Sequence, residues 1–181
     1  MNTLVKKTLN ATVLVVALYG VSAYGMDIFE AVRTGNVERV KALLTDKANV
    51  NKQNEYGRTP LWYAAAVGHQ EIVKMLLEAK AKVDLAGYDG WTPLHYAAAW
   101  YGHQGIVKML LDAKAKVDLA DEDGKTPLHR AAAEGNQEVV KMLIDAKAKV
   151  DLRNKSGETP LDLAKKEGHT AIVDLINNFK A

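Results

Sequence analysis

Histidines are the first side chains in this 181-residue chain to consider for chemistry, because a neutral imidazole can bind a metal ion or transfer a proton. His95 and His129 stand 34 residues apart at matching positions of a repeated pattern. Matching side chains of stacked units lie on the order of 10 Å apart, whereas nitrogens that share a zinc ion lie at about 2 Å from it. The spacing therefore argues against a shared metal site at these two residues.

Patterns for catalysis and for phosphate binding are missing from the sequence. No Ser or Cys stands beside a His and an acid in a recognisable motif. Neither Gly-x-Gly-x-x-Gly nor Gly-x-x-x-x-Gly-Lys occurs. The acidic run at 121–123 could hold calcium loosely, but it lacks the ligand spacing of a dedicated loop. We therefore predict a non-enzymatic protein with no metal and no cofactor.

Composition favours an ordinary folded domain and argues against a nucleic-acid partner. Hydrophobic residues make up 48% of the chain and charged residues 25%, and there is no cysteine for disulfides or thiolate zinc sites. The formal net charge of +2 comes from Lys6 and Lys7, so the remaining 22 basic residues equal the 22 acidic ones. No overall field steers such a chain toward nucleic acid.

The elements that carry these side chains recur along the chain. The triplet Thr-Pro-Leu begins at Thr59, Thr92, Thr126 and Thr159, in steps of 33, 34 and 33 residues. A period of this size predicts a stacked array of small units, in place of one globular fold around a buried pocket.

The unit that begins at Thr92 shows the expected plan. Its threonine can cap a helix whose first turn accepts proline, and this helix carries small alanines at 97–98 and stops near Gly102. Apolar residues at helical spacing over 106–111 predict a second, buried helix. An extended piece and a turn at 121–124 complete the unit. Each unit is thus two helices in a helix-turn-helix arrangement, joined to the next by a hairpin-like loop, in an all-α fold.

A longer motif recurs in phase with the triplet. Its residues are Gly57, Thr59, Pro60, Leu61, Ala64, Ala65 and Gly68; Gly90, Thr92, Pro93, Leu94, His95, Ala97, Ala98 and Gly102; Gly124, Thr126, Pro127, Leu128, His129, Ala131, Ala132 and Gly135; and Gly157, Thr159, Pro160, Leu161, Ala164 and Gly168. This motif resembles that of ankyrin repeat arrays. The resemblance implies an all-α, ankyrin-type solenoid over residues 26–181. Its expected units are 26–57 as the N-terminal cap, 58–90, 91–124, 125–157, and 158–181 as the C-terminal cap.

The resemblance also implies roles for the histidines. His95 and His129 are expected to hydrogen-bond locally and to hold neighbouring loops together. His69, His103 and His169 follow glycines at the starts of second helices and are interpreted as structural too.

Lysine departs from the family pattern at the end of each second helix, where the family usually has glycine in a left-handed conformation. A non-glycine residue there costs about 1 kcal/mol, while a cation at a helix C-terminus contributes about 0.3–1 kcal/mol. We expect the same turn, slightly strained, with the side chains in solvent. The residues are Lys47, Lys80, Lys114 and Lys147.

The third unit departs from the pattern in length. It has one extra residue within 99–101, which a helix could absorb as a one-turn bulge. Trp62 and Asp162 are a separate departure, since they stand where the other units have histidine.

The N-terminal 25 residues do not follow the repeat and resemble an export signal. Lys6 and Lys7 precede a mostly apolar run at 9–21, and small residues at Ala23 and Gly25 fit a cleavage site before Met26. We expect residues 1–25 to be a signal peptide and the mature protein to be periplasmic or secreted, with no membrane attachment after cleavage. The alternative is an uncleaved N-terminal anchor.

The resemblance implies a monomeric module that binds a partner protein on a concave face built from loops and first helices. Alternatives are a dedicated inhibitory or structural subunit of one enzyme, and a small enzyme or metal protein. Exposed aromatic residues favour the centre of such a site. Trp100 has a second interpretation, in which it packs on the neighbouring unit. The predicted centre is Tyr88, Trp91, Trp100 and Tyr101, and the predicted rim is Tyr56, Arg58, Glu122, Asp123 and Lys125.

Overall fold

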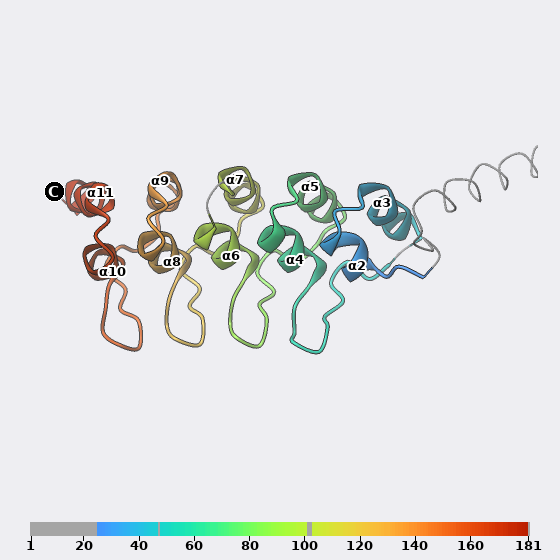
Figure 1. Ribbon diagram of the computed structural model, residues 1–181, viewed down its shortest axis with the longest axis horizontal. Coiled ribbons are helices and arrows are strands. Elements are labelled where there is room, and N and C mark those ends of the chain that lie inside the picture. Colours follow the sequence, from blue (N-terminus) through green and yellow to red (C-terminus); the bar gives the residue numbers. More distant parts are fainter. Residues whose placement is uncertain (1–24, 47, 101–102, 181) are drawn as a thin grey trace, which may run out of the picture.

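The computed structural model describes residues 25–46, 48–100 and 103–180, and all regular elements within those ranges are helices. These helices are arranged in pairs, in agreement with the predicted all-α fold built from two-helix units (Figure 1). The first helices of the pairs are α2 (Ile28–Arg33), α4 (Pro60–Val67), α6 (Pro93–Ala99), α8 (Pro127–Ala133) and α10 (Pro160–Lys166). The second helices are α3 (Val37–Thr45), α5 (Gln70–Glu78), α7 (Gln104–Asp112), α9 (Gln137–Asp145) and α11 (Thr170–Lys180).

The pairs stack along one axis. Figure 1 shows the first helices in one row and the second helices in a parallel row, with the connecting loops projecting beyond the first helices. Both rows follow a shallow arc that has the loops on its inner side. The helix-turn-helix units with hairpin-like loops that the repeat pattern predicts are therefore confirmed.

Threonine caps begin the first helices, as the Thr-Pro-Leu triplets predict. The Thr59 hydroxyl accepts a hydrogen bond from the backbone N–H of Trp62 at 3.1 Å, and Pro60 occupies the first turn. Thr92, Thr126 and Thr159 make the same cap. The first pair has no such triplet, and there the Asp27 carboxylate accepts from the N–H of Glu30 at 3.0 Å.

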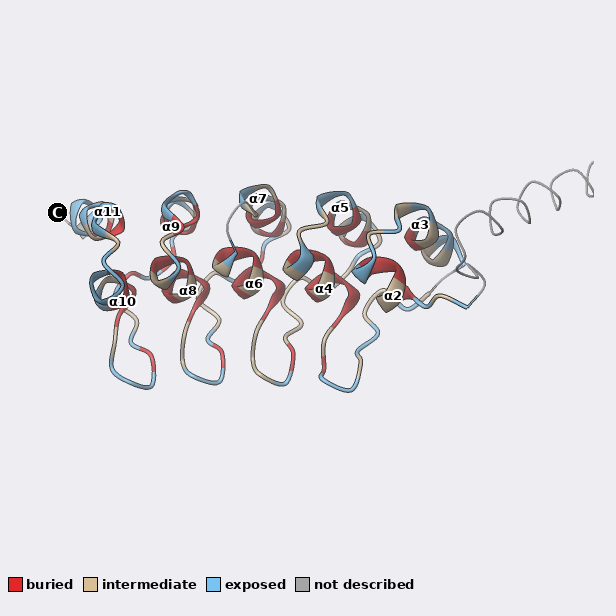
Figure 2. Cartoon of the chain, viewed as in Figure 1, coloured by how far each residue is buried: buried red, intermediate tan, exposed pale blue. Residues whose placement is uncertain are grey.

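The core lies where the two rows of helices meet (Figure 2). In the third unit the alanines at 97–98 are fully buried and let the first helices approach closely. Ile106, Val107 and Leu110 of α7 are also fully buried. The same positions are filled in each inner unit, so one apolar core runs through the array.

The lysines at the ends of the second helices adopt the expected left-handed turn. Lys80, Lys114 and Lys147 have φ values of 66°, 66° and 69°, and their side chains are exposed. Lys47 lies outside the described residues. The prediction of a glycine-like turn is confirmed at these three positions.

The extra residue of the third unit is not absorbed inside the helix, so the expected bulge is wrong. Helix α6 ends at Ala99, and Trp100 has an extended backbone with φ −99° and ψ 133°. An extended residue beyond the helix leaves the short hydrogen-bonded ladder of α6 intact, whereas a bulge would interrupt it. The predicted site residue Tyr101 lies outside the described residues.

His95 and His129 bond locally, as the resemblance implies. The backbone N–H of Thr92 donates to Nδ1 of His95 at 3.2 Å, so Nε2 carries the proton and donates to the carbonyl of Lys125 at 3.0 Å. His129 bonds in the same way to Thr126 and to the carbonyl of Glu158. Each imidazole therefore ties a helix start to the following loop.

The other three histidines pack on the preceding unit, and the His69 ring lies against Gly35. His169 Nε2 donates to the carbonyl of Ala133 at 3.0 Å, and its ring lies against Gly135. The His103 ring lies against Gly68. A Cβ at Gly68 would approach this ring to 2.6 Å, and Gly68 has a φ of +93°, so two independent reasons favour glycine there.

Lowering the pH from 7.5 to 5.5 should destabilise the array. Burial lowers the pKa of both His95 and His129, so protons bind more tightly to the unfolded chain. The free energy of unfolding therefore keeps its full value above the unfolded-state histidine pKa of about 6.5. It decreases as the pH falls below that value, because the unfolded chain then binds protons that the buried imidazoles do not. The loss at pH 5.5 is at most about 1.4 kcal/mol per histidine, and urea unfolding at the two pH values measures it.

A double variant provides the control for this pH effect. Glutamine at the third position of a helix can also bond back to the cap residue. His95→Gln combined with His129→Gln should therefore lower stability but reduce its pH dependence. An unchanged pH dependence in the double variant would assign the effect to other groups.

Candidate partner-binding face

The loop side of the array is built from helices α4, α6 and α8 and the loops at 54–58, 87–91 and 121–125 that lead into them. We call this surface the loop-side face. A side-chain oxygen organises the last of these loops, where Asp121 Oδ1 accepts from the backbone N–H groups of Asp123 and Lys125 at 2.9 and 2.8 Å.

Backbone hydrogen bonds join neighbouring loops. The N–H of Tyr88 donates to the carbonyl of Tyr56 at 3.0 Å, and the N–H of Glu122 donates to that of Asp89 at 3.2 Å. The loop tips are therefore held at fixed spacing, which lowers the entropy cost of binding a partner there.

A row of three aromatic rings with a cationic side chain at each end lies along the loop-side face. The Arg58 guanidinium lies 4.4 Å from the ring centroid of Trp62, and the Trp62 and Tyr96 centroids are 4.1 Å apart. Tyr96 is 4.4 Å from Trp91, whose ring in turn lies 4.1 Å from the Arg130 guanidinium. We call these five residues the stacked row.

Acidic side chains hold both ends of the stacked row. Arg58 lies 3.4 Å from Asp89, and Arg130 contacts Asp121 and, at 3.7 Å, Asp123. The Asp121 side chain is only 1% exposed. Burial alone would raise the pKa of Asp121, but the hydrogen bonds from Arg130 and from the Lys125 backbone, with the Arg130 charge, lower it. Asp121 is therefore a buried carboxylate that depends on Arg130.

Exposure separates the predicted aromatic residues into two groups. Tyr88 and Trp100 are 71% and 56% exposed, and Tyr56 is also exposed. Trp91 is half-buried within the stacked row, so the expectation that it is an exposed contact needs correction. The cause is Arg130, whose guanidinium covers the Trp91 ring.

Trp91 and Trp100 line one cavity of about 240 Å³. Its other lining residues are Tyr96, Ala99 and Glu134, from α6 and the end of α8. The structure thus brings two predicted site residues together and adds Tyr96, which the sequence analysis did not include in the site.

The predicted rim residues occupy the loops around these rings. The Arg58 guanidinium lies 5.3 Å from the Tyr56 ring, and the Tyr88 ring lies against Gly57. Glu122 and Asp123 are exposed at the tip of the next loop, and the Lys125 ammonium lies 4.0 Å from Asp123.

Sequence reasoning missed Trp62, Tyr96 and Arg130 as parts of this face. Tyr96 and Arg130 occupy the same position of their units, directly after the histidine of the motif. Comparison of that position between units would have shown an aromatic residue followed by a cation.

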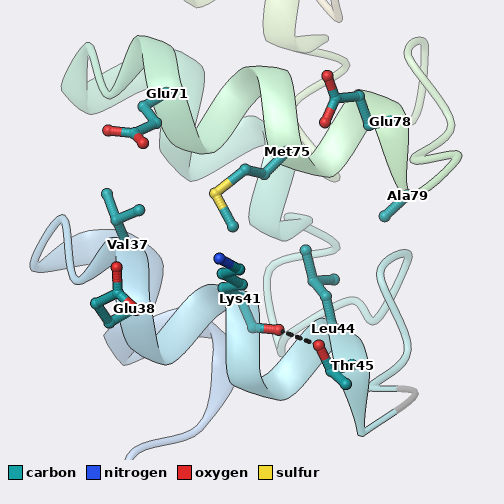
Figure 3. A pocket seen from close by; sticks show the side chains of 9 residues that line it. All are labelled: Val37, Glu38, Lys41, Leu44, Thr45, Glu71, Met75, Glu78 and Ala79. Atoms are coloured by element: carbon teal, nitrogen blue, oxygen red, sulfur yellow. Dashed lines mark hydrogen bonds between the residues drawn. The ribbon is translucent and has the colours of Figure 1, made fainter.

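A second hollow lies on the opposite row, between α3 and α5, with a volume of about 480 Å³. Figure 3 shows Met75 pointing from α5 toward α3 and Lys41 pointing back toward it. Apolar Val37 and Leu44 line the hollow together with glutamates. The glutamates are Glu38, Glu71 and Glu78.

Two other kinds of site are absent from the described part of the chain. Within it, no group of three or more His, Asp or Glu side chains is arranged to hold a metal ion. In the same ranges, no helix has the length and apolar character needed to span a bilayer.

A comparison with family models identifies the architecture. The model described as ankyrin repeats (3 copies) matches residues 28–121 and 98–180. No curated protein matches the chain. The two matched ranges together extend over all the helices described above.

Proposed function

The chain belongs to the ankyrin repeat family, and from this premise we propose that it is a non-catalytic module that binds a partner protein on its loop-side face. Ankyrin repeats are generally protein–protein interaction modules, and the family is typically non-catalytic. The partner and its site must be argued from this chain's own residues, because a fold does not determine a ligand.

The stacked row is the observation that supports this proposal most strongly. Tyr, Trp and Arg are the residues that dominate binding energy at protein interfaces. Trp62 is buried, and the other four residues of the row are partly exposed to a partner. Ring contacts and ion pairs hold these side chains in place, so a partner does not have to order them. Exposed Tyr88 and Trp100 add contact area beside the row.

Truncation of the exposed aromatics should weaken binding without unfolding the array. Tyr88→Ala and Trp100→Ala are each expected to cost about 1–3 kcal/mol, or roughly 5- to 150-fold in Kd. The partner is first identified by crosslinking in the native cell and mass spectrometry, and its Kd is then measured by calorimetry.

Phe179→Ala is the matched control, because Phe179 is a similarly exposed aromatic residue on the second helix α11. It should leave the Kd unchanged. If Tyr88→Ala and Trp100→Ala both bind the partner with unchanged affinity, the partner binds another surface. The same conclusion follows if Phe179→Ala loses as much affinity as they do.

We also propose that the module acts outside the cytoplasm, after residues 1–25 have been removed. The support is the order of Lys6 and Lys7, the apolar run at 9–21 and the small residues at 23–25. N-terminal sequencing of the mature protein should find a start near Met26, which leaves about 156 residues. An intact Met1 on the mature soluble protein would rule out the cleaved signal.

A further inference from the structure

We propose that the hollow between α3 and α5 is a second binding surface, which takes a basic amphipathic helix of a second partner protein. The hollow lies on the opposite row of helices from the loop-side face, so both surfaces can be occupied at once. We call it the α3–α5 groove. Its floor is apolar, and its walls carry more acidic than basic side chains.

The groove is open because the N-terminal unit has a short apolar residue where the inner units have glutamine. Val37 is the first residue of α3. The corresponding residues of α5, α7 and α9 are Gln70, Gln104 and Gln137. In the next gap, the Gln70 amide lies against Gly105 of α7. Val37 is too short to cover the α3–α5 gap in this way, so apolar surface stays uncovered there.

Four half-buried apolar side chains form the floor of the α3–α5 groove. Val37 and Leu44 come from α3, and Met75 and Ala79 come from α5 and its C-terminal end (Figure 3). The volume of about 480 Å³ lies in the range of about 300–1,000 Å³ that ligand sites have. An amphipathic helix binds such a groove with its apolar face, and the flexible thioether of Met75 can adapt to the side chains that enter.

The charges on the walls favour a basic occupant. Glu38 and Glu71 lie at one end of the groove and Glu78 at the other, whereas Lys41 is the one cation among the described lining residues (Figure 3). Within the described residues, neither Glu38 nor Glu71 has an ion pair or a side-chain hydrogen bond. Glu78 lies 4.0 Å from Lys74, but these side chains are 65% and 70% exposed, so their pair is weak. An acidic groove selects a basic partner by charge complementarity.

The spacing of the carboxylates fits two turns of a helix. Glu71 and Glu78 are seven residues apart on α5, which corresponds to about 10.5 Å along its axis. A partner helix that lies along the groove meets them with cations at positions i and i+7, and its residues i+3 and i+4 cover the apolar floor. Lys41 lies between the two ends and is the lining group that opposes a cation.

The test uses two synthetic peptides and the mature protein, which starts near Met26. The basic peptide is an amphipathic helix of about 15 residues, with leucines at i+3 and i+4 and lysines at i and i+7. Its acidic analogue has glutamate in place of every lysine. The basic peptide should shift the methyl resonance of Met75 saturably, and the acidic analogue should bind at least about tenfold more weakly.

Substitutions on the walls test the role of charge. Glu38→Gln combined with Glu71→Gln should lower the affinity for the basic peptide by about tenfold, whereas Lys41→Met should raise it by about threefold. Glu138→Gln is the matched control, because Glu138 occupies the position of Glu71 on α9, and it should leave the affinity unchanged. All four side chains are exposed, so the variants should fold, and circular dichroism verifies this.

Several results would overturn the inference. Equal binding of the two peptides, or unchanged binding by the double glutamine variant, would show that charge does not select the occupant. Absence of a Met75 shift with the basic peptide would remove the groove as its binding surface. A Met75 shift that depends on protein concentration alone would assign the groove to a second copy of the chain. Loss of peptide binding when residues 1–25 remain attached would assign it to the chain's own N-terminal segment.

The proposed function is tested separately from the groove. Tyr88 does not line the groove, so Tyr88→Ala should leave binding of the basic peptide unchanged. Failure of the peptide to bind would therefore leave the loop-side face as it stands.

Discussion

Arg130→Ala should lower the free energy of unfolding by about 3 kcal/mol or slightly more. Loss of one partner from a buried ion pair costs about 3–5 kcal/mol, because the remaining charge is left uncompensated. Asp121 is that remaining charge, with a side chain only 1% exposed. Two backbone N–H groups still bond to it, which places the effect at the lower end. Urea unfolding followed by circular dichroism measures the change.

A second substitution should rescue this variant. Asn154 and Asn54 occupy the position of Asp121 in other units, and each accepts from two loop N–H groups without a charge. Asp121→Asn added to Arg130→Ala should therefore recover part of the lost stability. If Asp121→Asn instead destabilises the Arg130→Ala protein further, the buried charge is not the cause.

The effect of Arg130→Ala should also depend on pH. The pKa of Asp121 is lower in the folded protein than in the unfolded chain, so its pair with Arg130 stabilises the fold at pH values above the unfolded-state pKa of about 3.9. This stabilisation is lost as the pH falls through the pKa of Asp121 in the folded protein. The difference in the free energy of unfolding between the wild type and Arg130→Ala should accordingly become smaller as the pH is lowered.

Leu110→Ala should destabilise the array by about 2–5 kcal/mol through lost burial and a cavity. Leu110 is fully buried at the centre of the array, where it contributes to the continuous core of α5, α7 and α9. Thermal and urea unfolding of the purified variant measure the loss. The physical reason is that each unit contacts only its neighbours, so a defect in the middle weakens both halves.

Leu175→Ala is the matched control for Leu110→Ala. Leu175 is only partly buried in the terminal helix α11, so the same chemical change should cost less there. Equal losses of unfolding free energy in Leu110→Ala and Leu175→Ala would contradict a core that is continuous through the middle of the array and thinner at its C-terminal unit.

The repeated backbone could be predicted from the sequence because local chemistry determines it. Thr-Pro-Leu at four positions specifies a cap and a first turn, and each triplet begins a helix in the structure. The lysine turns were also predicted, because the resemblance to ankyrin repeats implies a left-handed residue at 80, 114 and 147, and these residues have positive φ values. The prediction of a helix bulge within 99–101 was wrong, because the repeat pattern does not show whether an extra residue lies inside a helix or beyond its end.

The side-chain contacts of the loop-side face were less predictable. Arg58 meets Asp89, and Trp62 meets Tyr96, across more than 30 residues of sequence. Such contacts depend on the distance between neighbouring units and on the lengths of the side chains. The repeat length of the sequence determines neither of these. Trp91 was correctly expected at a loop end, but its burial under Arg130 could not be predicted from either residue alone.

Site-specific photocrosslinking tests the protein-binding face most directly. A benzoylphenylalanine is placed at Tyr88 or Trp100 on the loop side, and at Lys74 or Phe179 on second helices as controls. The proposed face predicts that the same partner is crosslinked from Tyr88 and Trp100 and not from the two control positions. Crosslinking of that partner from Lys74 or Phe179, with none from the loop-side positions, would contradict it.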